Sequence, residues 1–219
     1  MLTHSEENHL KCIYHLSNKS NGAINTNAIA KSLETKAASV TDMVQKLATK
    51  GLASYLKYKG VRLTTKGEKE ALKVVRKHRL WEVFLVKELG YNWDQVHDIA
   101  EQLEHIKSST LIDKLDTFLE YPKFDPHGDP IPDANGVIAS KPTTTLNILK
   151  PGDTCTVICA KDSSSDLLLF LDKVHISLGS KLEVIDYFEF DGSYSVKVDN
   201  GSAITLSTKV AENIFIDKL

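Results

Sequence analysis

The apolar residues of the N-terminal third recur every three to four positions, which is the spacing of an amphipathic helix. This pattern predicts three helices, at residues 6–17, 25–33 and 38–52. Asn or Thr caps the start of the second helix, and Gly51 closes the third. Because only residues 34–37 separate the second and third helices, the pattern predicts a helix-turn-helix arrangement.

Residues 52–67 change to an alternation of apolar and polar side chains around Lys59 and Gly60. A period of two predicts a β-hairpin. A hairpin that directly follows the third helix makes this the winged form of the helix-turn-helix.

Two further helices are predicted in the middle of the chain. Residues 68–89 form a long helix in which LWEVFLV is apolar nearly all round. This helix should be buried on more than one side, consistent with packing across a dimer interface. Residues 94–109 form the next helix. Beyond residue 137 the pattern predicts strands at 154–162, 180–188 and 194–200, and a short helix at 166–174.

Titratable side chains lie on both middle helices. His78 and Glu82 are one turn apart on the apolar face of the long helix. A lone histidine there is usually a core residue, but a buried carboxylate is costly unless a cation compensates it. The next helix carries two imidazoles and two carboxylates in one predicted arc: His97, Glu101, Glu104 and His105. For that arc alone the alternative is an exposed acidic helix. Together, the residues predict a nitrogen and oxygen site suited to manganese, ferrous iron or zinc.

The net charge of −2 over 219 residues hides an asymmetry. Residues 1–76 hold 13 Lys and Arg against 6 Asp and Glu, a net charge of +7, which leaves −9 for the remainder. A basic N-terminal region is the footprint of nucleic-acid binding, although basic surfaces also serve solubility.

Polar side chains on the outer face of the third helix can reach bases and phosphates, and those on the hairpin can reach phosphates. On the helix they are Lys36, Ser39, Thr41, Asp42 and Lys46, and on the hairpin Lys57, Lys59 and Arg62. These side chains favour DNA binding over the alternative, a protein–protein module built on the same scaffold.

Neither a membrane span nor a secretory signal is predicted. No apolar run approaches the ~18 residues that a bilayer requires, and MLTHSEENHL lacks the basic and apolar regions of a signal peptide. Cys155 and Cys159 stand four apart on a predicted strand, which is too far for a disulfide. We therefore expect a cytoplasmic protein without membrane association.

Several segments of the chain resemble, in order, the diphtheria toxin repressor and manganese transport regulator family of metal-dependent transcriptional repressors. They are NAIAKSL, SVTDMVQKLATKGL, GVRLTTKG, VRKHRLWEVFL, VHDIAEQLEH and HGDPIP, and they extend the resemblance over essentially the whole chain. The most specific are KHRLWE, the VHD…E..EH block and the HGDPIP turn at residues 127–132.

The resemblance implies a mainly α fold with a small β domain. The implied domains are a winged helix-turn-helix at residues 1–66, a helical dimerisation and metal-binding domain at 67–136, and an SH3-like (FeoA-like) β-barrel at 137–219. It also implies a homodimer that binds double-stranded operator DNA.

The resemblance further implies two metal sites in each subunit. The first would be formed by His78, Glu82, His97 and a carboxylate of the barrel, Asp166 in preference to Asp162. The second would be formed by Glu101, Glu104, His105 and Asn8, with Glu7 as a substitute for Asn8. Iron-type members have cysteine where this chain has Glu101, and a hard carboxylate favours Mn2+, with Fe2+ as the alternative.

The predicted function is a metal-dependent repressor of metal-uptake genes, because a bound metal would bias the dimer toward its DNA-binding state. One alternative is a winged-helix regulator that senses a small organic ligand. A metallohydrolase is a weaker alternative, because it needs an open coordination position and a substrate cleft, and the sequence carries no nucleophile motif or phosphate loop. We therefore expect no enzymatic activity.

Overall fold

The computed structural model describes residues 2–19, 22–56, 60–93, 95–140, 143–160, 165–199 and 201–218. The chain divides into two compact units. The first contains residues 1–78, 104–107 and 132–137, and the second contains residues 79–103, 108–131 and 138–219. The division falls within the long helix α4 (Thr65–Lys87).

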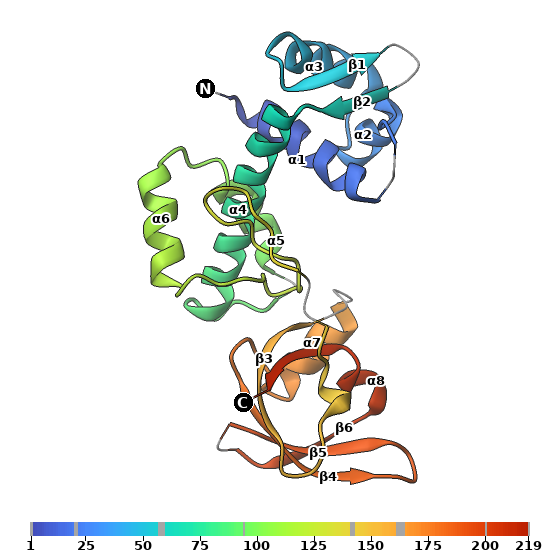
Figure 1. The fold of residues 1–219 in the computed structure, drawn as a ribbon, viewed down its shortest axis with the longest axis vertical. Coiled ribbons are helices and arrows are strands. Elements are labelled where there is room, and N and C mark those ends of the chain that lie inside the picture. The colour runs from blue at the N-terminus through green and yellow to red at the C-terminus, as the bar shows by residue number, and fades with distance from the viewer. Residues whose placement is uncertain are drawn as a thin grey trace. The chain divides into compact units, whose positions relative to one another are not determined.

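Three helices and a hairpin precede α4 in the first unit (Figure 1). They are α1 (His4–Lys19), α2 (Thr26–Ser32), α3 (Ala37–Thr49), β1 (Ala53–Leu56) and β2 (Gly60–Leu63). The two strands pair antiparallel, with Ala53 opposite Leu63 and Leu56 opposite Gly60. The predicted winged helix-turn-helix is confirmed.

The apolar residues that define the helical spacing form the core of this unit. Leu10 and Ile13 of α1, Ile29 of α2, and Val40 and Val44 of α3 have no exposed surface. Full burial of such a side chain contributes about 1.5–3 kcal/mol. The opposite face of α3 is therefore the one that carries its polar residues.

Two glycines shape the passage from α3 through the hairpin to α4. Gly51 has a φ of +70°; its N–H donates to Ala48 O at 2.9 Å, and that of Leu52 donates to Leu47 O at 2.9 Å. This is the Schellman pattern that ends a helix. At Gly67, an added Cβ would lie 1.8 Å from the carbonyl oxygen of Leu52, so a larger residue would force the start of α4 away from the base of the hairpin.

The second unit contains the remainder of α4, two helices and a C-terminal β region (Figure 1). The two helices are α5 (Val96–Leu103) and α6 (Ser109–Phe118). The β region comprises η1 (Leu146–Ile148), β3 (Thr154–Ala160), α7 (Ser165–Lys173), β4 (Lys181–Phe188), β5 (Ser193–Val198), β6 (Ala203–Leu206), α8 (Thr208–Ala211) and β7 (Ile214–Lys218).

The five strands of the β region form one antiparallel sheet in the order β6-β5-β4-β3-β7. Cys155 and Cys159 of β3 are fully buried and form no disulfide, which is consistent with small buried apolar residues.

The apolar pattern predicts β3, β4, β5 and α7, but it does not predict α6, β6, α8 or β7. The fold class, mainly α with a small β domain, is confirmed. Among the described residues, no helix is both long and apolar enough to cross a bilayer.

Candidate metal centres

Helix α4 buries the imidazole of His78 and the carboxylate of Glu82 on its apolar face. His78 is 8% exposed and Glu82 is 2% exposed. Val74, Val75 and Leu85, which share that face, are buried as well. The helix therefore presents an imidazole and a carboxylate to surroundings shielded from water, where each needs a polar or charged partner.

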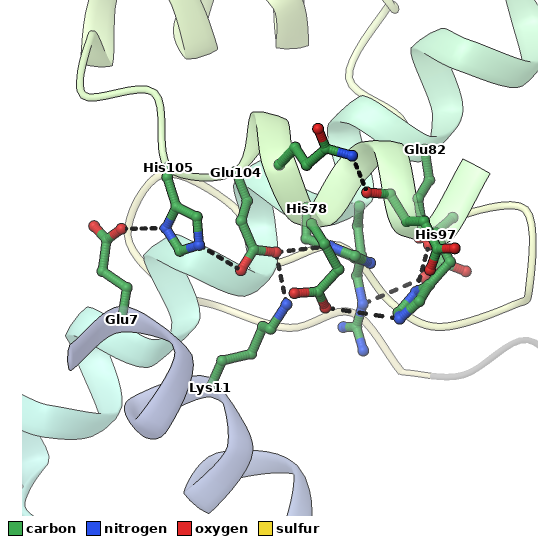
Figure 2. Close-up of polar contacts among 12 residues, drawn as sticks. Glu7, Lys11, His78, Glu82, His97, Glu104 and His105 are labelled. Carbon is green, nitrogen blue, oxygen red and sulfur yellow. Dashed lines mark hydrogen bonds and ion pairs between the residues drawn. The ribbon is translucent and has the colours of Figure 1, made fainter. Parts of the chain in front are cut away.

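Five polar residues of the first unit form a cluster, which we call the Glu104 cluster (Figure 2). Its members are Glu7 and Lys11 of α1, His78 of α4, and Glu104 and His105. Glu104 Oε2 lies 2.7 Å from both Lys11 Nζ and His78 Nδ1. His105 Nδ1 donates to Glu7 Oε2 at 2.6 Å, and His105 Nε2 lies 3.8 Å from Glu104 Oε1. Polar contacts thus connect α1, α4 and residues 104–107.

The carboxylates of the Glu104 cluster lie beside lysines. Burial raises the pKa of Glu104, but the hydrogen bond from His78 and the charge of Lys11 outweigh burial and hold this pKa below its usual value. At Glu7, Lys77 Nζ lies 3.6 Å from Oε1. Each glutamate of the cluster therefore has an ammonium group next to it.

Two buried oxygen atoms in this part of the molecule lack a hydrogen-bond donor. Glu104 Oε1 and Asn8 Oδ1 accept no hydrogen bond from the residues that the structure describes. The contact with Glu7 favours a proton on Nδ1 of His105, and in the neutral ring this leaves a lone pair on Nε2. Carboxylate oxygen, amide oxygen and imidazole nitrogen are ligands that Mn2+ and Fe2+ accept. Glu104 Oε1 and His105 Nε2, which lie 3.8 Å apart, therefore fit a divalent metal ion.

A second cluster lies in the second unit, and we call it the Glu82 cluster. It comprises Glu82, His97, Glu101 and His127. His97 Nδ1 lies 3.4 Å from Glu82 Oε1, and His127 Nε2 lies 3.8 Å from the same oxygen. His97 Nε2 lies 3.6 Å from Glu101 Oε1. The side chain of His97 is 62% exposed, so the cluster extends from a buried carboxylate to the surface.

A buried acidic group accompanies the Glu82 cluster. Asp125 Oδ1 accepts hydrogen bonds from the backbone N–H groups of His127 and Asp129, both at 2.9 Å, and Oδ2 lies 3.3 Å from Arg79 Nε. Burial, followed by the charge of Glu82, raises the pKa of Asp125 to about 7 despite the nearby Arg79. Two acidic groups therefore repel each other here, and a divalent cation would relieve that repulsion. The donor set of this cluster also fits a metal ion.

Helix α5 is shorter than the sequence predicts. It ends at Leu103, so Glu104 and His105 lie in a turn beyond it, in the first unit, whereas His97 and Glu101 lie on α5 in the second. The prediction that all four residues share one arc of a single helix is wrong. The physical reason is that Glu104 is buried against Lys11 and His78, and these contacts outweigh one further turn of helical hydrogen bonds.

The other predicted ligands occupy varied positions. Asn8 is half-buried on α1, next to the buried Glu7. Asp166 is exposed in the first turn of α7, and Asp162 lies outside the described residues. The structure brings Glu82 together with His97, and Glu104 with His105 and Glu7. It places His78, which we predicted with Glu82, in hydrogen-bond contact with Glu104.

Two residues of these clusters, Lys11 and His127, are absent from the predicted ligand sets, as is Lys77 beside Glu7. Lys11 stands one turn after Glu7 on α1, a spacing that signals a shared face. Nothing local in the sequence indicates that Glu104 packs against that face. His127 belongs to the HGDPIP segment, where the sequence indicates only a turn.

The predicted DNA-reading residues are mostly exposed. Those of α3 and its cap are Lys36, Ser39, Asp42 and Lys46, and Arg62 is exposed on β2. Thr41 is half-buried, and its hydroxyl donates to Ala37 O at 2.9 Å. Lys57 and Lys59 lie outside the described residues. The contacts of all these side chains with DNA stay a prediction.

Comparison with known proteins identifies the family. The model of the iron dependent repressor N-terminal DNA binding domain matches residues 1–61, that of the iron dependent repressor metal binding and dimerisation domain matches 64–133, and that of the FeoA domain matches 144–218. The HTH-type transcriptional regulator MntR of Oceanobacillus iheyensis is 38% identical over 125 residues, which are 57% of this chain and 84% of that protein. The iron-dependent repressor IdeR of Mycobacterium leprae is 34% identical over 131 residues, which are 60% of this chain and 56% of that protein.

A solved structure extends the similarity over the whole chain. It is a manganese-dependent transcriptional repressor in complex with manganese, which is 38% identical with a TM-score of 0.64. The alignment covers 98% of this chain and 100% of that one. The chain therefore belongs to the iron-dependent repressor family, and it is a metal-dependent transcriptional repressor with a FeoA-like C-terminal domain. The named relatives are transcriptional regulators rather than enzymes.

Proposed function

We propose that this repressor is activated by Mn2+, with Fe2+ as the alternative ion, and that it binds operator DNA as a homodimer to control metal-uptake genes. The observation that carries the proposal is the pair of buried acceptor oxygens, Glu104 Oε1 and Asn8 Oδ1, together with the lone pair of His105 Nε2. A donor set of hard oxygens and imidazole favours manganese and ferrous iron over softer ions. The manganese named for the solved relative supports the same ion.

We assign one ion to each cluster, two in each subunit. In the Glu104 cluster, Glu104, His105 and Asn8 would hold the ion, while Glu7 orients the ring of His105. In the Glu82 cluster, Glu82 and His97 would hold the ion together with His127 and Glu101. We move Glu101 to this ion because its contact is with His97, and His78 to the Glu104 cluster because its contact is with Glu104. Asp166 is kept as the proposed ligand from the β region.

The domain boundaries proposed from the sequence are 1–66, 67–136 and 137–219. The family models, which end at residue 61, span 64–133 and resume at 144, support this division. We propose that the first domain binds the operator, that the second pairs the two subunits, and that the protein acts in the cytoplasm because its target is DNA. We assign no catalytic role to either cluster.

Helix α1 links the Glu104 cluster to the DNA-reading helix within the first unit. Glu7 and Lys11 contact other residues of the cluster. The neighbouring Glu6 is buried, and its Oε1 accepts a hydrogen bond from Lys50 Nζ at 2.6 Å. Lys50 is the C-cap of α3. A bound ion supplies the charge that holds Glu104 and Asn8 in one arrangement. Through Glu6 and Lys50, the position of α1 then sets the position of α3, so metal binding and DNA reading are coupled.

The proposal is tested by measuring DNA affinity with and without metal. Duplexes would first be selected from a random library by the Mn2+-loaded chain, and the selected duplex measured by fluorescence anisotropy with Mn2+, with Fe2+ under anaerobic conditions, and with a chelator. We expect a gain in affinity of tenfold or more with Mn2+, about 1.4 kcal/mol. Equal affinity with Mn2+ and with chelator contradicts metal activation.

A further inference from the structure

Lys11 forms an ion pair with one of the two carboxylate oxygens of the buried Glu104. Lys11 Nζ lies 2.7 Å from Glu104 Oε2, and the two side chains are 10% and 0% exposed. The same oxygen accepts the hydrogen bond from His78 Nδ1, also at 2.7 Å. Two donors therefore already engage Oε2, and one of them carries a full positive charge (Figure 2).

The other oxygen of Glu104 has different surroundings. Oε1 accepts no hydrogen bond from the described residues, and it faces His105 Nε2 at 3.8 Å. Two ligand atoms of one metal ion commonly stand about this far apart, because each lies near 2.1 Å from the ion. The two carboxylate oxygens of Glu104 thus differ: Oε2 is bound by Lys11, and Oε1 is available to an ion.

The contacts of Oε2 limit how many metal ions the cluster can bind. A carboxylate with both oxygens free can bridge two divalent ions, which in paired sites stand about 3.5–4 Å apart. An ion on Oε2 would have to displace the Lys11 ammonium or lie next to it, in a site from which water is largely excluded. Like charges at such separations repel strongly where the dielectric constant is low.

The charge of the cluster leads to the same limit. Glu7 and Glu104 supply two negative charges, while Lys11 in the cluster and Lys77 beside it supply two positive ones. The cluster and Lys77 together are therefore neutral before any ion binds, if the imidazoles are neutral. One divalent ion already leaves an excess of positive charge, and a second would double it.

We propose that Lys11 is a built-in cation that takes the place of a second metal ion, so that the Glu104 cluster binds a single ion, at Glu104 Oε1 and His105 Nε2. This inference rests on the proposed function, in which the Glu104 cluster is a metal centre. Lys11 then determines metal stoichiometry, and it keeps Glu104 neutralised when the metal is absent.

The first test counts ions in the full chain. The protein would be saturated with Mn2+, freed of unbound metal by gel filtration, and analysed by inductively coupled plasma mass spectrometry. We expect His105→Ala to lose one ion per subunit relative to the wild type, and Lys11→Glu to gain one, because a carboxylate then replaces the ammonium. The charge-matched control is Lys73→Glu, since Lys73 is exposed on α4 and paired with Glu70. Its Mn2+ content should equal that of the wild type.

Electron paramagnetic resonance adds a second readout on the same samples. The wild type should show isolated Mn2+ ions, whereas Lys11→Glu should show an exchange-coupled pair. A wild type with a coupled pair, a loss of two ions from His105→Ala, or a folded Lys11→Glu with unchanged Mn2+ content overturns the role of Lys11. If His105→Ala loses no ion, the Glu104 cluster is not a metal centre, and that part of the proposed function fails as well.

Lys11→Met serves if Lys11→Glu does not fold, because it keeps most of the side-chain volume without the charge. Its melting temperature without metal should fall below that of the wild type, since Glu104 is then buried without its cation. Mn2+ should raise the melting temperature of Lys11→Met by more than it raises that of the wild type. An equal metal-induced rise in the two proteins overturns the inference.

Discussion

In the Glu104 cluster, Glu104 lies beside Lys11, and Glu7 lies beside Lys77. In the Glu82 cluster the buried carboxylate faces the imidazoles of His97 and His127, and its charge raises the pKa of Asp125. A buried carboxylate requires a compensating charge in either place. The first cluster carries that charge on Lys11, whereas the contacts described for Glu82 are with two imidazoles. Removing the acid should therefore have different consequences in the two clusters.

The largest expected effect is that of Glu104→Gln in the absence of metal. Lys11 would keep a buried positive charge without its partner, and breaking such a pair costs about 3–5 kcal/mol of folding free energy. Urea unfolding in the presence of a chelator, followed by circular dichroism, measures this loss. The control is Glu70→Gln, which breaks the exposed ion pair with Lys73 and should cost less than about 1 kcal/mol. Equal losses in the two variants would remove the distinction between the clusters.

Glu82→Gln should behave in the opposite way. Without metal its stability should stay within about 1 kcal/mol of the wild type, because the change also removes a charge that repels Asp125. With Mn2+ at a hundred times its dissociation constant, the variant should lack about 2.7 kcal/mol of metal-induced stabilisation. Melting curves with and without Mn2+ measure both quantities. A large loss of stability without metal would show that Glu82 has a compensating cation of its own.

Glu101→Cys should change which metal is preferred. A thiolate in place of a carboxylate should move the balance from Mn2+ toward Zn2+ or Co2+ by about tenfold, or about 1.4 kcal/mol. Competition titrations with the two kinds of ion provide the measurement. If Glu101 belongs to the Glu82 cluster, the shift should vanish when Glu82→Gln is also present. A shift that persists in the double variant would assign Glu101 to another ion.

Breaking the ion pair between Glu6 of α1 and Lys50 should weaken DNA binding without changing the metal content. Glu6→Gln and Lys50→Gln each break the 2.6 Å ion pair, and each should reduce the metal-dependent gain in DNA affinity by about 1 kcal/mol. The double variant should lose no more than either single one, because all three lack the same interaction. Anisotropy titrations, with Mn2+ content measured in parallel, test this. Additive losses would mean that Lys50 acts by another route, such as direct contact with phosphate.

The smallest effect concerns Arg62, which lies on the hairpin and outside both clusters. Arg62→Ala should weaken binding to all DNA sequences alike and lower the salt slope of the affinity by about one. The Mn2+ content and the metal-induced rise in melting temperature should stay unchanged. Affinity measured over a series of salt concentrations gives the slope. An unchanged slope would show that Arg62 makes no contact with phosphate.

Local patterns in the sequence were enough to predict the winged helix-turn-helix and α4, because helical spacing, capping residues and hairpin alternation depend on near neighbours in the chain. The same spacing placed His78 and Glu82 on an apolar face, where the structure finds both buried. The family was also recognisable from the sequence, since its motifs are contiguous segments.

Only the tertiary structure decided which charges meet. The pattern extended α5 through Glu104 and His105, but the helix ends at Leu103, and Glu104 lies with Lys11 and His78. These three residues are far apart in the chain, so no spacing rule relates them. The free energy of a buried carboxylate depends on the charges that surround it in space. The partners of Glu104 can therefore be identified only from the tertiary structure.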